Sequence, residues 1–568
     1  MKNSSKKLKG CQVTVKCLEK MNVDIMFAYP GGCSLELHQA LQDSDIRVVL
    51  PRHEQGGAFA AAGYARATGK VGVCMATSGP GATNLITGIA DAYMDSIPCV
   101  FITGQVPLSL IGRNAFQETD FVGMTRPIVK HNYLVLDAKD LPRIIKEAFH
   151  IASTGRPGPV LIDIPKNVQQ QLIDENIEYD CEMDIPMYEY HYHVKKEEID
   201  SIKEAIKNSK KPCVYAGGGI ISAEANDELL EFAEKYNIPV VTTLMGVGGF
   251  PETHPLSLKW LGMHGTVYAN NAANECDLLL TFGARFDDRV TGPVETFARD
   301  AKIVHVDIDL SEINKNKFAD IGVVGNIKDV LAELNKEPIH QGYADWHNQI
   351  AEWKEDYPLT YKNNDNAIQP QYVMEKICEL TNGEAIIVPG VGQHQMFASQ
   401  YYTFSYPRQL LTSGGLGTMG FGTPTAMGAK LACPEKTVIN IDGDGSFQMN
   451  IQELGTIHME HIGMKMVVLN NQHLGMVAQW EDRFYGSVRG NTELGNDKVD
   501  RPYPNFVGIA AGYEIPGREV YKKEDVVDAI REMLETDGPF ILDVHTGYQE
   551  HVLPMIPPGK CYKDIITE

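Results

Sequence analysis

VINIDGDGSFQMNIQELGTIHMEHIGMKMVVLNN, residues 438–471, is the stretch that decides the fold. Its apolar VINI predicts a strand, the turn DGDG follows, a helix is predicted over Asn450–Glu460, and the apolar MVVL predicts a second strand. Strand, helix and strand in this order form a βαβ unit, whose two strands are parallel. Asp444 and Asn471 therefore follow successive strands at one edge of a sheet, where open α/β sheets bind ligands.

The residue types at this edge suit a divalent cation that holds a diphosphate. Carboxylate and amide oxygens, as in Asp444 and Asn471, are ligands that Mg²⁺ prefers. Gly443 and Gly445 would let phosphates approach the backbone. Taken singly, Asp-Gly and Asn-Asn are ordinary turn residues. Their separation by 27 positions across one βαβ unit makes the pair far more specific.

Outward from this unit, strand-like runs alternate with helix-like patterns along nearly the whole chain of 568 residues. Such alternation predicts parallel sheets covered by helices. At about 150 residues per domain the length allows three to four domains, and polar segments divide the pattern into three blocks. The polar, acidic stretch over residues 174–200 predicts a linker. We therefore expect an α/β fold of three doubly wound domains, at residues 1–180, 190–340 and 365–568.

The composition excludes several classes of partner. Lys and Arg number 51 against 74 Asp and Glu, a net charge of −23, which disfavours nucleic acid and anionic membrane surfaces. No apolar stretch approaches the length of about 18 residues that spans a bilayer. Eleven cysteines without a CxxC pair indicate neither a disulfide framework nor a zinc site. The start, MKNSSKKLKG, has no apolar signal region, so we expect a cytoplasmic protein.

A candidate acid–base residue lies in the first block. Glu54 occurs in PRHEQGG, residues 51–57, directly after the apolar run 47–50. A glutamate at a helix start is most often only a favourable charge on the helix dipole, so Glu54 alone decides nothing. Two glycine-rich turns precede and follow it, YPGG at 29–32 and ATSGPG at 76–81. The second opens a helix and suits a close approach of ligand to backbone.

Together, GDG…NN at residues 443–471, Glu54 and the two turns resemble the thiamine diphosphate (ThDP)-dependent enzymes. The resemblance runs from about residue 10 to the C-terminus, and within that family it points to the catalytic subunits of the acetohydroxyacid (acetolactate) synthases. It implies a pyrimidine-binding, a central and a diphosphate-binding domain, in that order. The most specific stretches are TGQVP at 103–107, AFQET at 115–119, GRPGPV at 155–160, RFDDRVTG at 285–292, GQHQM at 392–396 and VLPM at 552–555.

The resemblance implies how ThDP and Mg²⁺ are held. Glu54 would hold N1′ of the aminopyrimidine, while Asp444, Asn471 and the backbone carbonyl of His473 would bind Mg²⁺. Met419 would sit between the two cofactor rings and keep the cofactor bent, although a methionine more often only fills a core. The other implied ThDP contacts are Gln393, His394, Gly417, Gly443, Gly445 and Met476.

It also implies a site for 2-ketoacid anions. Arg289 would meet the carboxylate of the second ketoacid, unless it only pairs with Asp287 or Asp288. Trp480 matches the family residue that favours 2-ketobutyrate over pyruvate as acceptor, although a tryptophan is more often part of a core. The remaining residues implied for the catalytic centre and the substrate funnel are Gly31, Phe116, Gln117 and Lys166.

The second block resembles the FAD site of the biosynthetic members of this family. Its GGG at 217–219, after a strand, is a weak nucleotide signal alone, because it is not GxGxxG. Since the implied reaction has no redox step, FAD would be structural. The implied FAD residues are Arg156, Gly217, Gly218, Gly219, Thr243, Leu244, Met263, His264, Gly283, Arg285, Asp307, Ile308 and Asn326.

The implied reaction decarboxylates pyruvate on ThDP and transfers the two-carbon unit to a second 2-ketoacid, pyruvate or 2-ketobutyrate. The products, 2-acetolactate and 2-aceto-2-hydroxybutyrate, belong to branched-chain amino-acid (valine, leucine and isoleucine) biosynthesis. In the family the cofactor lies between the first domain of one subunit and the third of another, which implies a homodimer or homotetramer, with a separate regulatory small subunit. Two alternatives stay open: another ThDP-dependent decarboxylase, oxidase or carboligase, and a non-catalytic nucleotide-binding protein that has no need for Glu54 with Asp444 and Asn471.

Overall fold

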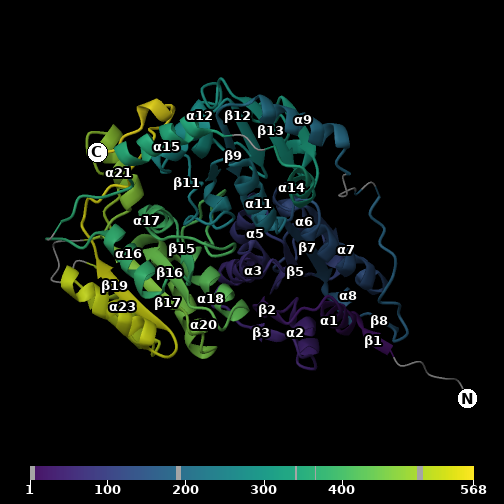
Figure 1. The fold of residues 1–568 in the computed structure, drawn as a ribbon. Coiled ribbons are helices and arrows are strands. Elements are labelled where there is room, and N and C mark those ends of the chain that lie inside the picture. The colour runs from purple at the N-terminus through teal and green to yellow at the C-terminus, as the bar shows by residue number, and fades with distance from the viewer. Residues whose placement is uncertain (1–6, 187, 189–192, 340–341, 365, 496–502) are drawn as a thin grey trace, which may run out of the picture.

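The computed structural model describes residues 7–186, 188, 193–339, 342–364, 366–495 and 503–568. Three parallel sheets follow one another along the chain, and helices pack around each of them (Figure 1). The predicted α/β class with three doubly wound parallel-sheet domains is therefore confirmed. The expected domain limits at residues 1, 190, 340 and 365 lie outside the described residues.

The first sheet has six parallel strands in the order β3-β2-β4-β5-β7-β6. Successive residues of its central strands face opposite sides of the sheet, so that Val73 belongs to one hydrophobic core and Cys74 to another. Both faces are apolar because helices cover both of them. The strands are β2 (Ile25–Ala28), β3 (Arg47–Val49), β4 (Gly72–Ala76), β5 (Cys99–Gln105), β6 (His131–Leu134) and β7 (Pro159–Pro165). The helices are α1 (Gly10–Lys20), α2 (Leu35–Leu41), α3 (Glu54–Thr68), α4 (Pro80–Thr83), α5 (Ile86–Met94), α6 (Phe121–Thr125), α7 (Leu141–Ser153) and α8 (Lys166–Gln170).

The second sheet also has six parallel strands, in the order β11-β10-β9-β12-β13-β14. Its direction of winding reverses between β9 and β12, which creates a topological switch point there. The strands are β9 (Pro212–Ala216), β10 (Val240–Thr242), β11 (Ser257–Trp260), β12 (Leu278–Phe282), β13 (Lys302–Asp307) and β14 (Ile321–Val324). The helices are α9 (Lys196–Asn208), α10 (Gly218–Ser222), α11 (Asn226–Tyr236), α12 (Val267–Glu275), α13 (Asp288–Thr291), α14 (Ile327–Lys336) and α15 (Ala344–Asp356).

The third sheet has five parallel strands in the order β15-β16-β17-β19-β18. The strands are β15 (Ile386–Pro389), β16 (Val438–Gly443), β17 (Lys465–Asn470), β18 (Gly517–Val520) and β19 (Phe540–His545). The helices are α16 (Pro370–Leu380), α17 (Gln393–Tyr401), α18 (Gly422–Ala432), α19 (Asp444–Phe447), α20 (Leu454–Met459), α21 (Gly475–Phe484), α22 (Phe506–Gly512) and α23 (Val526–Glu535).

Two sequence predictions about these elements are wrong in detail. The helix expected over Asn450–Glu460 begins at Asp444, and a 3₁₀ segment with extended φ at Asn450 (−133°) divides it into α19 and α20. The linker expected over 174–200 overlaps structured residues at both ends. Its first residue belongs to β8 (Leu172–Asp174), which pairs antiparallel with β1 (Lys7–Lys9), and its last five residues belong to α9.

The first and third domains share one continuous hydrophobic core, centred on α3 and α18. These two helices lie side by side in the middle of Figure 1. A Cβ atom on Gly63 would lie 2.2 Å from the carbonyl oxygen of Thr425, and one on Gly428 would lie 1.9 Å from that of Ala60. Since such contacts are impossible, each helix needs glycine for the other backbone to approach this closely.

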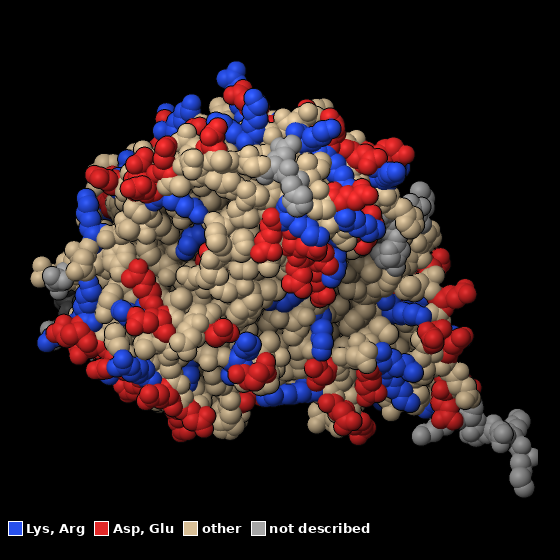
Figure 2. Space-filling view, viewed as in Figure 1, with Lys and Arg blue, Asp and Glu red and all other residues tan. Residues whose placement is uncertain are grey.

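Acidic residues outnumber basic ones, and side chains of both signs lie at the surface (Figure 2). On the face shown in Figure 2, acidic and basic side chains are interspersed rather than separated by sign. In the part of the chain that the structure describes, no helix combines the length and the apolar character needed to cross a bilayer.

Candidate active site

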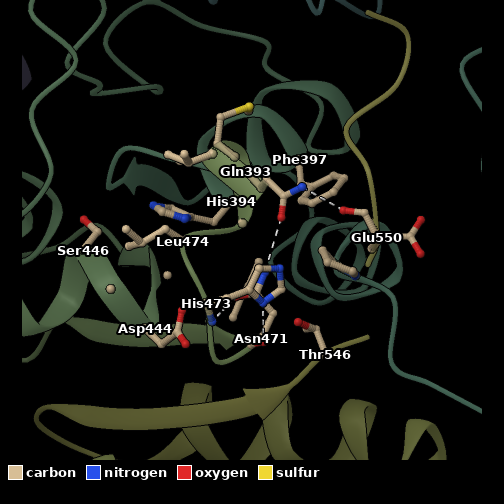
Figure 3. Close-up of a pocket in the computed structure, with 18 of the residues that line it drawn as sticks. Gln393, His394, Phe397, Asp444, Ser446, Asn471, His473, Leu474, Thr546 and Glu550 are labelled. Carbon is tan, nitrogen blue, oxygen red and sulfur yellow. Dashed lines mark hydrogen bonds between the residues drawn. The ribbon is translucent and has the colours of Figure 1, made fainter. Parts of the chain in front are cut away.

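A pocket opens at the carboxyl ends of the third sheet, at the edge where the sequence predicts a ligand site. Val391 follows β15, Asp444 follows β16, Asn471 follows β17 and Thr546 follows β19. Figure 3 shows these ends with the side chains that line the pocket. The sheet thus brings Asp444 and Asn471 to one cavity, as their spacing predicts.

Three helices begin at this pocket. Gln393, Asp444 and Gly475 are the first residues of α17, α19 and α21, and all three line the cavity. The first N–H groups of a helix have no partner within the helix, and the helix dipole places positive charge there. The longer helices, α17 and α21, therefore make the pocket suitable for an anion such as a diphosphate.

Asp444 has the properties of a cation ligand. The residue is buried, and its Oδ2 atom has no hydrogen-bond partner among the described residues. Burial raises the pKa of this carboxyl to about 7, although a hydrogen bond with Tyr503 and two backbone N–H groups oppose the shift. A buried carboxylate oxygen without a partner is unfavourable unless a cation balances it.

Asn471 and His473 complete an oxygen-rich edge. The side-chain N–H of Asn471 donates to Gln393 Oε1 at 3.3 Å, which turns its amide oxygen away from Gln393. The ring Nδ1 of His473 lies 2.6 Å from the backbone carbonyl oxygen of Asn471, and the ring packs on Tyr548. Because this ring is engaged elsewhere, an imidazole ligand is disfavoured and the oxygens of the segment suit Mg²⁺.

The predicted residue Gln393 belongs to a network that also contains residues not predicted. Its Nε2 donates to Gln479 Oε1 at 3.0 Å and to the carbonyl oxygen of Glu550 at 2.9 Å, as Figure 3 shows for Glu550. Gln479 in turn accepts from the N–H of Val552 at 2.8 Å. The available signal for Gln479 was its position next to Trp480 in the sequence, whereas nothing local pointed to Glu550.

Small and flexible residues shape the inner wall of the pocket. A Cβ on Gly443 would lie 2.6 Å from the ring of His394, and one on Gly445 would lie 2.8 Å from Leu474. Protein side chains thus already occupy the space that these glycines leave. Met419 lies 3.6 Å from the same Gly445 position. Met476 also lines the pocket, and Gly417 (φ +70°) lies in the irregular loop that carries Met419.

Glu54 lies in a separate cluster at the carboxyl edge of the first sheet. It is the first residue of α3, and its Oε2 accepts from the side-chain N–H of Asn84 at 2.9 Å. A Cβ on Gly81 would lie 3.2 Å from Glu54 Oε1 and 2.8 Å from Thr77, and one on Gly31 would lie 2.4 Å from Thr77. Among the described residues, none from the first domain lines the pocket of Asp444. Asn84 and Thr77 were not predicted as site residues.

The other residues predicted in the first domain lie around this cluster. Gln117 has a φ of +57° and packs on Gly79. A Cβ on Gly79 would lie 2.8 Å from the carbonyl oxygen of Gln117. Lys166 begins α8 directly after β7, at the same edge of the sheet. Phe116 is 88% exposed, which leaves its ring available to a ligand or a second chain.

Arg289 and Trp480, predicted from separate blocks, meet in the structure. The Arg289 guanidinium carbon lies 5.9 Å from the centre of the Trp480 ring, within cation–π range. Its Nε is 4.0 Å from Asp288 Oδ2, and both side chains are more than 60% exposed, so this ion pair is weak. Asp287 accepts the Arg289 backbone N–H, not its side chain. The charge of Arg289 therefore stays available to an anion.

The residues predicted for FAD gather at one edge of the second sheet. All those within this domain lie at the carboxyl end of a strand or within four residues of it. Arg156 reaches the same edge from the first domain, where it pairs with Glu312 at 2.5 Å and Asp309 at 3.4 Å. This edge includes the switch point between β9 and β12, the usual place of a nucleotide in such sheets.

The glycines at the switch point are also required by backbone packing alone. A Cβ on Gly217 would lie 2.0 Å from the carbonyl oxygen of Gly283, and one on Gly219 would lie 2.7 Å from its Cα. The two turns that follow β9 and β12 therefore touch through their backbones. The glycine cluster is explained by this contact, and it does not by itself require a bound cofactor.

Comparison with known proteins gives consistent matches over the whole chain. Three family profiles match in order: thiamine pyrophosphate enzyme, N-terminal TPP binding domain, at residues 8–124; the central domain at 199–334; and the C-terminal TPP binding domain at 390–544. The chain is 54% identical to the chloroplastic acetolactate synthase of Arabidopsis thaliana, over 99% of this chain and 84% of the relative. Acetolactate synthase 1 of Oryza sativa subsp. japonica is also 54% identical, over 99% and 88%.

The predicted cytoplasmic location is contradicted by these relatives. The acetolactate synthases of Arabidopsis thaliana, Oryza sativa and Brassica napus are all chloroplastic proteins. Net charge constrains membrane and nucleic-acid contacts, but it does not determine in which compartment a protein of this composition is found.

Proposed function

The chain belongs to the acetolactate synthases of the thiamine diphosphate-dependent enzyme family, and from this premise we propose how its residues carry out the reaction. The enzyme binds ThDP and acts on small 2-ketoacids. Bound ThDP supplies the carbon nucleophile and the electron sink that decarboxylation of a ketoacid requires. The proposed substrates are pyruvate as donor and pyruvate or 2-ketobutyrate as acceptor, as branched-chain amino-acid synthesis needs.

The observation that carries the site assignment is the buried, unpartnered Oδ2 of Asp444 at the edge that it shares with Asn471. We assign Mg²⁺ to Asp444, the amide oxygen of Asn471 and the backbone carbonyl of His473, because these groups offer oxygen only. The diphosphate would face the starts of α17 and α21, beside Gln393 and His394.

Glu54 is assigned to hold the proton at N1′ of the aminopyrimidine. Asn84 orients its carboxylate, and Gly81 lets Glu54 and Thr77 pack closely, since a Cβ there would lie 3.2 Å from Glu54 and 2.8 Å from Thr77. Gly417, Met419 and Met476 would contact the cofactor rings from the third domain. The substrate would lie among Gly31, Phe116, Gln117, Lys166, Arg289 and Trp480.

FAD is proposed at the carboxyl edge of the second sheet. The donor set is compatible with a dinucleotide: Arg156, paired with Glu312 and Asp309, places donor N–H groups at this edge, and Asp307, whose pKa burial raises to about 6, offers an acceptor for a ribose hydroxyl. FAD would have a structural role there. Flavin absorbance in the purified protein, and its loss in Arg156→Ala without loss of ThDP binding, would support this assignment.

The assembly is proposed to be a homodimer or a homotetramer, joined by a regulatory small subunit. Support for the dimer comes from Glu54, which is not among the described residues that line the pocket of Asp444 in its own chain. The proposed domains are residues 1–180 for the pyrimidine, 190–340 for FAD and 365–568 for the diphosphate and Mg²⁺.

Product analysis tests the proposal. The protein with ThDP, Mg²⁺ and pyruvate should yield acetolactate, and Glu54→Gln should abolish this while ThDP still binds. Asp444→Asn should abolish both activity and Mg²⁺-dependent ThDP binding. Asp528→Asn, at an exposed surface ion pair, is the control and should change neither. Full activity of Glu54→Gln would refute the assignment, and acetaldehyde, acetate or peroxide as the main product would indicate a decarboxylase or an oxidase.

A further inference from the structure

A buried charge cluster joins the first domain to the third. Arg66, in the last turn of α3, lies between Asp91 and Asp95, with an Nη2 to carboxylate distance of 2.8 Å to each. These three side chains are at most 3% exposed. Burying such a group costs desolvation free energy that the ion pairs rarely exceed, so stability alone is a poor explanation for the cluster.

The cluster holds both ends of the loop 412–421. This loop forms neither helix nor strand, and it precedes α18. Arg66 Nη1 donates to the carbonyl oxygen of Thr412 at 2.9 Å, and the guanidinium carbon lies 5.0 Å from the centre of the Phe421 ring. One side chain therefore fixes where the loop begins and where it ends.

The two carboxylates hold the interior of the same loop. Asp95 accepts two successive backbone N–H groups, at 3.1 and 2.7 Å, and Asp91 accepts two hydroxyl groups. A Cβ on the second of the two glycines would lie 2.9 Å from Asp95, so a side chain would push the carboxylate away. The loop residues in these contacts are Ser413, Gly414, Gly415 and Thr418.

The loop carries pocket residues just beyond these anchors. Gly417 is exposed and has a left-handed φ of +70°, and Met419 lines the pocket of Asp444. We propose that Arg66, Asp91 and Asp95 are positioning residues that set loop 412–421, and with it Met419, against the rings of ThDP. This inference rests on the proposed function, in which Met419 contacts those rings.

The helix α3 would then serve two purposes. Glu54 lies at its first residue and Arg66 twelve residues later, about 18 Å along the axis. In a dimer whose sites each combine two chains, the same rigid element would orient the carboxylate for N1′ in one site and the loop that bounds the cofactor in the other. We therefore expect the buried charge cluster to affect the binding of the ring end of ThDP and not the binding of its diphosphate end.

Calorimetry with two probes separates these ends. Each variant is titrated with ThDP and, separately, with inorganic pyrophosphate, both with Mg²⁺. Asp95→Asn should weaken ThDP binding about tenfold, the effect of losing one charge-assisted hydrogen bond, and leave pyrophosphate binding unchanged. Ser413→Ala, which spares the ion pairs, should do the same more weakly. Glu460→Gln, which breaks the Arg47–Glu460 pair between the same domains, is the control and should alter neither.

Hydrogen exchange of the ligand-free protein gives a second readout. The amides of Gly414 and Gly415 should exchange faster in Asp95→Asn than in the wild type, while the core strands stay protected. Equal exchange, or an equal loss of affinity for both probes, would overturn the inference. Failure of the wild type to bind ThDP would instead refute the proposed function, and loop exchange would still decide the role of the cluster.

Discussion

A mixture of two inactive variants tests whether each active site needs two chains. In one chain Glu54 lies with Asn84 at the edge of the first sheet, whereas the described residues around Asp444 come from the third domain. Glu54→Gln removes the group assigned to N1′, and Asp444→Asn removes the charge assigned to Mg²⁺. Each variant alone should therefore form dimers without acetolactate synthesis.

The size of the recovery follows from the geometry of a two-fold dimer. If each site takes Glu54 from one chain and Asp444 from the other, a mixed dimer has both defects in one site and an intact second site. Random assortment makes half of the dimers mixed, so the mixture should regain about a quarter of the wild-type activity. If both residues served a site within one chain, every site would carry one defect and the mixture would stay inactive.

The assay is acetolactate formation from pyruvate after the two variants are co-expressed under separate affinity tags. Purification through both tags in series isolates the mixed dimers, whose activity should be about half that of the wild type. Each variant carrying both tags, purified in the same way, is the control for residual activity. Mixed dimers that are present but no more active than these controls would refute the two-chain site.

Three further predictions follow from other contacts. Gly63→Ala should lower stability by about 1–3 kcal/mol, because its methyl group would collide with a carbonyl of α18, whereas Gly512→Ala, in open space at a helix end, should leave the Tm within a degree or two. Trp480→Ala removes the ring next to Arg289 and should lower the ratio of 2-aceto-2-hydroxybutyrate to 2-acetolactate about tenfold in competition; an unchanged ratio would contradict its role. Burial raises the pKa of Asp163 from 3.8 to about 7. As the pH rises from about 4 to 7, this carboxyl loses its proton in the unfolded chain but keeps it in the folded chain, so the free energy of unfolding falls. Asp163→Asn should flatten the dependence of Tm on pH in this range.

The local sequence pattern was sufficient to predict the sheet edge at which Asp444 and Asn471 lie. Apolar runs of strand length, joined by one helical segment, place the residues after both strands at the same end of a parallel sheet. The start of the helix was predicted six residues late, because Asp-Gly is typical of a turn. In the structure Asp444 already begins α19, and the break comes later, at Asn450.

The amino-acid sequence by itself determined the α/β class, the three domains and the edge of the third sheet at which Asp444 and Asn471 lie. Tertiary structure alone decided that Gln479 and Glu550 hold Gln393 and that Arg289 lies over Trp480. Periodicity and spacing report contacts within one unit of strand and helix, because they arise from backbone geometry over a few residues. Contacts such as Gln393 with Gln479, 86 positions apart, depend on how separate units pack, and no local pattern encodes that packing.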